Sequence, residues 1–299
     1  MNIRQQLKEA IVSDSERKKV GIGRDFTQIG DTFMFELKKN LIPFLIMMII
    51  TALMFTLFVL LQTLQEVQDV PLPDEAIQYF ISYFQYIFGF LVVLTAAGFA
   101  GSIIAEDFQK QTGNLIFPKI SKSRLFIGRI MARYLMNAIC IVFYYILVTS
   151  ITFIKYGEIP LMGILTSLIW ALFYTFALFS MVTFVSSIMK STSASIIVSV
   201  FLYLLVFTMI QQIMNYLAGG VEPWFLLSYY ENIITNIVNM PDPRYREVTM
   251  GFGPGGGVTF YQWVTPNVLT AFFGILIYSV LFLTLAYVRY RRRQSKSES

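Results

Sequence analysis

Two adjacent carboxylates, Glu106 and Asp107, follow the second of several long apolar stretches and open the part of the sequence richest in chemically capable residues. The sequence contains no histidine, which excludes Ser-His-Asp and Cys-His catalysis and His-ligated zinc. The single cysteine, Cys140, lies inside an apolar stretch, so neither a disulfide framework nor a cysteine metal cluster is expected. We therefore expect no catalytic residue, metal or cofactor on this chain.

Nucleotide hydrolysis by the chain itself is also not expected. The sequence has no G-x-x-x-x-G-K-[ST] motif, whose backbone would cradle the phosphates of ATP. The glycine-rich stretch 251–257 is not followed by lysine and is more typical of a flexible turn. Any work driven by ATP would need a separate ATPase.

Six apolar stretches dominate the chain, and 56% of its residues are hydrophobic. Crossing a hydrocarbon core about 30 Å thick takes about 20 apolar residues of helix. The predicted spans are 41–61, 77–104, 131–154, 161–188, 193–217 and 268–288. Because each span must satisfy its own backbone hydrogen bonds, we expect an all-α polytopic membrane protein, built as one domain over 1–299 with no separate soluble domain.

Lys and Arg residues are distributed unevenly between the loops. All but three of the 23 lie in 1–40, in 105–133, at Lys190 or in the basic tail 289–299. Short loops rich in Lys and Arg stay on the cytoplasmic side of a membrane. We therefore predict a protein of the cell membrane with both termini in the cytoplasm and the helical bundle over 41–288. The net charge of +5 then indicates contact with anionic lipid head groups rather than nucleic acid.

A short segment before the first span, 25–39, has apolar residues at roughly helical spacing. These are Phe26, Ile29, Phe33 and Leu37, with Glu36 among the polar residues between them. The segment is too short and too polar to cross a membrane, and it predicts a helix lying along the inner leaflet. A disordered lead-in with chance periodicity is the alternative.

Charged residues are absent from the central parts of the spans, where ion-coupled carriers usually keep them. The main polar groups within the spans are Gln85, Asn137, Gln211 and Gln212. They are candidates either for hydrogen bonds between helices or for the lining of a substrate path.

The outer segment between the fifth and sixth spans, 218–266, is too apolar for a free loop. Short extracellular helices that dip into the outer leaflet would account for it, with Trp224, Tyr261 and Trp263 at head-group depth. An ordinary loop packed on the bundle is the alternative. Thr265 and Pro266 are the expected cap and first residue of the last span.

The inner segment after the second span has a further pattern of features. In chain order these are Glu106, Thr112-Gly113, the apolar run Leu115 to Phe117, Pro118 and the basic stretch Arg124 to Arg129. This layout resembles that of the permease subunits of type-2 ATP-binding-cassette transporters, although Gly and Thr stand in reversed order here.

The resemblance extends over most of the chain and implies roles for its inner segments. The stretch from Glu106 to Pro118, with Asp107, Thr112, Gly113 and Phe117, would form a coupling helix that docks on a separate ATPase subunit, which would carry ATP and Mg²⁺. The segment with Glu36 is similar to the family's connecting helix, and Lys190-Ser191 to its inner turn. The expected partners are that ATPase, a second copy or a similar permease, and lipids. The resemblance favours export, and the apolar, aromatic-rich spans favour amphipathic cargo.

Three other classes of function remain open at this point. A channel or self-powered carrier would move solute without any partner. A membrane-embedded enzyme would need two carboxylates or a Ser-Lys pair within the spans. A passive anchoring subunit would bind an ATPase but would not support transport.

Overall fold

The computed structural model describes residues 22–67, 73, 75–109, 122–217, 221–251 and 257–295. The helices of the first half are α2 (Ile22–Lys39), α3 (Leu41–Val67), α4 (Ala76–Tyr83), the π-helical turn η1 (Phe84–Phe88), α5 (Gly89–Ala100), α6 (Ala105–Gln109) and α8 (Lys122–Tyr156). The second half contains α9 (Leu161–Ile188), α10 (Thr192–Phe201), the π-helical turn η2 (Leu202–Phe207), α11 (Thr208–Leu217), α12 (Leu227–Asn236), β1 (Tyr245–Gly251), β2 (Gly257–Trp263) and α13 (Val268–Ser295).

Six helices of the described chain are long and apolar enough to cross a membrane, the same number as the predicted spans. The third span is longer than predicted, because its helix begins at Lys122 rather than at residue 131. Its 35 residues reach about 52 Å at 1.5 Å per residue, well beyond a 30 Å hydrocarbon core. The basic residues from Arg124 to Arg133 therefore lie on a helix and not in a loop.

The helix α9 forms the centre of the bundle and packs against α13, α5, α12, α10 and α8. Its buried face includes small residues such as Ala171, Ala177 and Ser180, which allow neighbouring helices to approach closely. By contrast, α3 leaves much of its apolar surface exposed, as expected for a helix that faces lipid.

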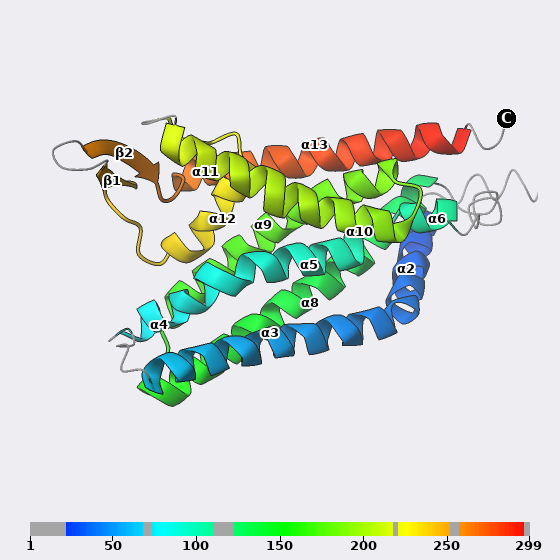
Figure 1. Ribbon diagram of the computed structural model, residues 1–299. Helices are drawn as coiled ribbons and strands as arrows, with labels where there is room; N and C mark the ends of the chain where they lie inside the picture. Colours follow the sequence, from blue (N-terminus) through cyan, green and yellow to red (C-terminus); the bar gives the residue numbers. More distant parts are fainter. Residues whose placement is uncertain are drawn as a thin grey trace, which may run out of the picture.

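The two ends of the bundle differ in structure (Figure 1). At one end, here called the α2 end, α2 runs across the spans rather than along them, and α6 and the last turns of α13 lie at the same end. At the other end, here called the hairpin end, lie α4, α12 and the two strands.

The predicted periodic segment before the first span is helical, as α2. Thr32 and Glu36 are buried on the face toward α8, while Phe26 and Phe35 remain 71% and 61% exposed. Ile29, Phe33 and Leu37 are partly buried beside that face. The exposed aromatic residues are suited to a lipid surface, so the interfacial placement of α2 stays a prediction that this pattern supports.

The outer segment is only partly as predicted, because its described residues form one short helix and a hairpin instead of several short helices. The strands β1 and β2 pair antiparallel, with Tyr245 opposite Trp263 and Gly251 opposite Gly257. Trp263 therefore lies on a strand, and so does Tyr261. Residues 252–256 of the glycine-rich stretch lie outside the described residues.

The expected cap of the last span is also displaced along the chain. Thr265 and Pro266 precede α13 outside regular secondary structure, and the helix begins only at Val268. The side chain of Asn267 accepts a hydrogen bond from the backbone N–H of Leu269 at 3.1 Å. Asn267 therefore supplies the N-terminal cap, a role for which asparagine is well suited.

Candidate functional site

Six charged residues meet at the α2 end of the bundle and form what we call the ionic cluster. Its members are Glu36, Lys39, Glu106, Asp107, Arg129 and Arg133. They come from α2, α6 and α8, and their formal charges sum to zero. The cluster joins the predicted interfacial helix to the second and third spans.

Arg129 binds two carboxylates in the buried part of the ionic cluster. One terminal nitrogen lies 2.6 Å from Asp107 Oδ2, and its Nε lies 3.1 Å from Glu36 Oε1. The same terminal nitrogen donates to the backbone carbonyl of Ile103 at 3.3 Å. Asp107 and Arg129 are almost fully buried, so water screens this pair little.

Arg133 makes the second set of contacts and is only 1% exposed. One terminal nitrogen lies 2.9 Å from Glu36 Oε2 and 3.1 Å from Glu106 Oε2, and the other donates to Ser102 Oγ. Lys39 Nζ completes the set at 2.9 Å from Glu106 Oε2. Glu106 is therefore shared between a buried arginine and a half-exposed lysine.

Glu36 is the carboxylate that both arginines share. Burial by itself would raise the pKa of Glu36, but the positive charges of Arg133, Arg129 and Lys39 hold its pKa below the ordinary value of 4.5. The side-chain amide of Asn40 also donates to Glu36 Oε2 at 3.0 Å. Glu36 is thus an anion at neutral pH, as two buried guanidinium groups require.

The sixth span reaches the same cluster. The Tyr290 hydroxyl donates to Asp107 Oδ2 at 3.5 Å, and its ring stacks on Phe126 with centroids 5.7 Å apart. One turn earlier, the Tyr287 hydroxyl shares a hydrogen bond with Ser123 Oγ at 2.5 Å. The end of α13 is therefore fixed to the beginning of α8.

A serine of α9 stabilises the break between α5 and α6. Ser186 Oγ accepts hydrogen bonds from the backbone N–H groups of Ile104 and Ala105 at 3.1 and 3.0 Å, and donates to the carbonyl of Gly101 at 2.8 Å. A helix that breaks while buried leaves such groups without intrahelical partners, and Ser186 supplies them.

The predicted inner turn lies beside α6. Ser191 caps α10 by accepting a hydrogen bond from the backbone N–H of Ala194 at 3.3 Å, while Lys190 is exposed. Gln109 of α6 accepts from both the backbone N–H and the hydroxyl of Thr192, at 3.1 and 2.9 Å. The turn and the end of the second span are therefore held together.

The predicted coupling segment is described only at its two ends. Thr112, Gly113, Phe117 and Pro118 lie outside the described residues. Arg124 donates from one terminal nitrogen to the side-chain carbonyl of Gln28 on α2 at 2.6 Å. At the other end the two carboxylates are engaged inside the ionic cluster, so any docking role would belong mainly to the residues between.

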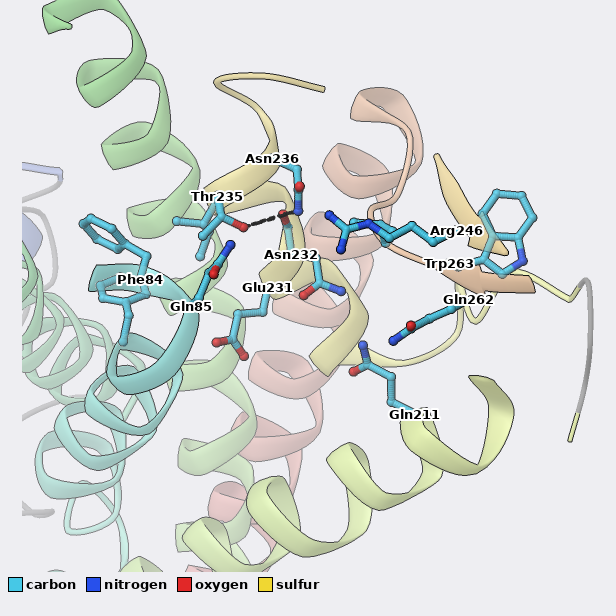
Figure 2. A pocket seen from close by; sticks show the side chains of 13 residues that line it. Phe84, Gln85, Gln211, Glu231, Asn232, Thr235, Asn236, Arg246, Gln262 and Trp263 are labelled. Atoms are coloured by element: carbon cyan, nitrogen blue, oxygen red, sulfur yellow. Dashed lines mark hydrogen bonds between the residues drawn. The ribbon is translucent and has the colours of Figure 1, made fainter. Parts of the chain in front are cut away.

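At the hairpin end, polar side chains surround a cavity of about 370 Å³, here called the outer cavity (Figure 2). It is lined by Phe84, Gln85, Phe88, Gln211, Glu231, Asn232, Ile234, Thr235, Asn236, Arg246, Gln262, Trp263 and Val264. These residues come from η1, α11, α12, the hairpin and the residue directly after it. Side-chain amides are the most frequent group in this lining.

Glu231 is the acidic residue of the outer cavity, and the absence of charge from the central parts of the spans gave no signal for it. It lies on α12, outside the six spans, yet its carboxylate enters the bundle. Tyr203 donates to Glu231 Oε2, and the hydroxyls of Tyr203 and Tyr174 are also hydrogen-bonded. A Cβ on Gly89 would stand 2.2 Å from Glu231 Oε1, so glycine leaves the space that this carboxylate occupies.

Burial has a clear electrostatic effect on this carboxylate. It raises the pKa of Glu231 above the ordinary value of 4.5, and hydrogen bonds from Tyr203 and Tyr174 act in the opposite direction. Among the described residues no Lys or Arg lies within ion-pair distance of it.

The polar residues predicted for a substrate path are separated by the structure. Gln85 and Gln211 both line the outer cavity. Gln212, the neighbour of Gln211, is exposed and does not line it. Asn137 is fully buried in α8, and neither of its amide atoms has a hydrogen-bond partner in the part of the chain that is described.

Both π-helical turns adjoin the outer cavity. Phe84, Gln85 and Phe88 of η1 line it, and Tyr203 of η2 donates to Glu231. A π-helical turn inside an α-helix often accompanies a functional site.

Over the described ranges, no group of three or more His, Cys, Asp or Glu side chains is placed to hold a metal ion. No protein-family model matches the chain, and the comparison with curated proteins finds no match. Function must therefore be argued from the ionic cluster and the outer cavity.

Proposed function

We propose that this chain is the membrane-embedded permease of a transporter driven by a separate ATPase, and that the α2 end faces the cytoplasm. The observation that carries the proposal is the ionic cluster. It braces segment 110–121 at both ends, through Asp107 before the segment and Arg129 after it. A force applied to that segment would reach the second and third spans together.

The cluster also has the connections that such a role needs. Glu36 connects the cluster to α2, and Tyr290 connects it to α13. The hydrogen bonds of Gln109 connect α6 to the turn before α10. Coupling between distant sites travels through packed, hydrogen-bonded elements of this kind. A second permease, either a copy or a similar chain, would complete the translocation path, and ATP with Mg²⁺ would bind the ATPase.

Co-purification tests this proposal. The chain, purified from its source organism in mild detergent, should bring down a protein with a phosphate-binding loop, identified by mass spectrometry. Phe117→Asp removes an apolar side chain of segment 110–121 and should lower the captured ATPase about tenfold, the effect of about 1.4 kcal/mol of lost binding.

The matched control is Phe225→Asp, at a residue of the hairpin end that is 42% exposed. This variant should capture the ATPase as the parent does. The proposal would be refuted if no such ATPase co-purified with the parent chain, or if Phe117→Asp captured as much ATPase as the parent.

A self-powered carrier is the second candidate, and Glu231 is the observation that favours it. Carboxylates at membrane depth often mark ion paths in carriers. Uphill movement of solute by the purified chain alone in vesicles, abolished in Glu231→Gln, would select this candidate over the first.

A further inference from the structure

The outer cavity contains a negative charge without a positive partner among the described residues. Glu231 Oε2 accepts a hydrogen bond from Tyr203, and the side chain lines the cavity. A partly buried carboxylate whose pKa is raised is more stable as an anion once a cation lies beside it. The site is therefore electrostatically suited to a cationic group.

The side chains around this carboxylate define which kind of cation fits. The carboxamides of the lining are Gln85, Gln211, Asn232, Asn236 and Gln262. Each offers one carbonyl acceptor and two N–H donors. A primary ammonium, with three N–H donors, can use these acceptors together with the carboxylate, whereas a quaternary ammonium cannot donate at all.

A positive side chain stands at another part of the same cavity. Arg246, on β1, lines it and is exposed at the hairpin. In Figure 2 its guanidinium points toward the space that Asn232 and Asn236 also border. A guanidinium binds carboxylate or phosphate through paired hydrogen bonds.

We propose that the outer cavity binds a small zwitterion, with a primary ammonium at Glu231 and a carboxylate or phosphate at Arg246. The volume of about 370 Å³ falls in the range of small-molecule sites. Such a ligand could be a short peptide or the head group of an ethanolamine lipid. That it is transported cargo rests on the proposed function, but its binding does not.

Other ligands fit the lining less well. A hard metal cation would take six or more oxygen ligands, and carboxylates dominate such sites, whereas Glu231 is the single carboxylate of this lining. A neutral sugar would satisfy the amides but would leave Glu231 without a counter-charge.

Binding can be measured on the chain alone, without its ATPase. The protein is placed in nanodiscs of phosphatidylcholine, whose head group has no N–H, and titrated calorimetrically. The probes are glycylglycine, phosphoethanolamine and N-acetyl-glycylglycine, which lacks the ammonium. Saturable binding of glycylglycine identifies a peptide source, tighter binding of phosphoethanolamine identifies a lipid head group, and either result supports the proposal.

The acetylated probe should bind about 30-fold more weakly than glycylglycine, because it leaves Glu231 unpaired. Binding of neither zwitterion, or equal binding of the acetylated probe, would overturn the proposal. Both of these comparisons use the parent protein and do not depend on the folding of a variant.

Substitutions then assign the charge to its residue. Glu231→Gln keeps an acceptor for Tyr203 and should weaken zwitterion binding about 30-fold, while Arg246→Gln, at an exposed site, should weaken it about threefold. The matched control Glu247→Gln removes an exposed carboxylate one residue from Arg246, on the opposite face of β1, and should leave the affinity unchanged. Unchanged affinity in Glu231→Gln would refute the assignment. A failure to bind zwitterions would not change the ATPase-capture result, so the two proposals can be refuted independently.

Discussion

Replacing Glu36 by glutamine tests the role of the ionic cluster directly. The change keeps the size of the side chain and removes one negative charge that Arg129 and Arg133 share. Glu36 is 1% exposed, so solvent cannot replace the missing charge. We therefore expect a large loss of stability without a change in the secondary structure.

The magnitude follows from the geometry of the two ion pairs. Removing one partner of a buried ion pair costs about 3–5 kcal/mol, because the other charge stays buried without compensation. Here each arginine keeps a second carboxylate, Asp107 at 2.6 Å for Arg129 and Glu106 at 3.1 Å for Arg133. The expected loss is therefore about 3 kcal/mol, at the lower end of that range.

Reversible unfolding by SDS in mixed micelles, followed by circular dichroism, measures this free energy. Glu158→Gln removes an exposed carboxylate at the hairpin end and should leave stability unchanged within about 0.5 kcal/mol. If Glu36→Gln is as stable as the parent, Arg129 and Arg133 do not need the charge of Glu36, and the ionic cluster does not stabilise the packing of α2.

Three further predictions concern the same end of the bundle. Because the pKa of Glu36 is lowered in the folded state, its contribution to stability is present above about pH 4.5 and should be lost as the pH falls further, a loss absent from Glu36→Gln. Ser186→Ala leaves two buried N–H groups unpaired and should cost about 2 kcal/mol in the same assay. Its control, Ser180→Ala, loses only a bond to the preceding turn and should cost less than half as much. Gly128→Val places a Cβ 2.8 Å from a side-chain atom of α2 and should lower stability by about 2 kcal/mol, with α2 more accessible to protease; an unchanged digestion pattern would contradict that packing.

The spans and α2 could be predicted because their signals are local. Six apolar runs long enough to cross a membrane follow from composition and length alone. The helical spacing of Phe26, Ile29 and Phe33 likewise predicted α2. The start of the third span was misplaced because the basic residues before 131 were assigned to a loop, although long basic side chains are compatible with a helix that extends beyond the membrane.

The hairpin was missed even though the sequence contains a signal for it. Tyr245, Val248 and Thr249 are followed by a glycine-rich stretch and then by Phe260 and Trp263, residues of high β propensity on either side of a turn. The general apolar character of the outer segment favoured helices instead. Cross-strand aromatic pairs such as Tyr245 with Trp263, 5.6 Å apart, stabilise the strand pairing.

The two candidate sites could not be read from spacing, because distant parts of the chain form them. Glu36 and Arg133 are 97 residues apart, and nothing local in either segment indicates that they pair. Glu231 was overlooked because it precedes the last span in sequence, whereas α12 folds inward against α9. The positions of Gln85 and Gln211 were identified as polar, but only the fold brings them to one cavity.

The turns η1 and η2 change the phase of their helices. A π-helical turn contains about one residue more than an α-helical turn, and one residue corresponds to about 100° of rotation. A single helical wheel drawn over the second or fifth span would therefore assign the wrong faces on one side of the turn. Moving such a turn by one position exchanges one set of backbone hydrogen bonds for another of the same kind. Such a move would turn only the residue that it passes, so the side chains that each span presents beside the outer cavity depend on the position of its π-helical turn.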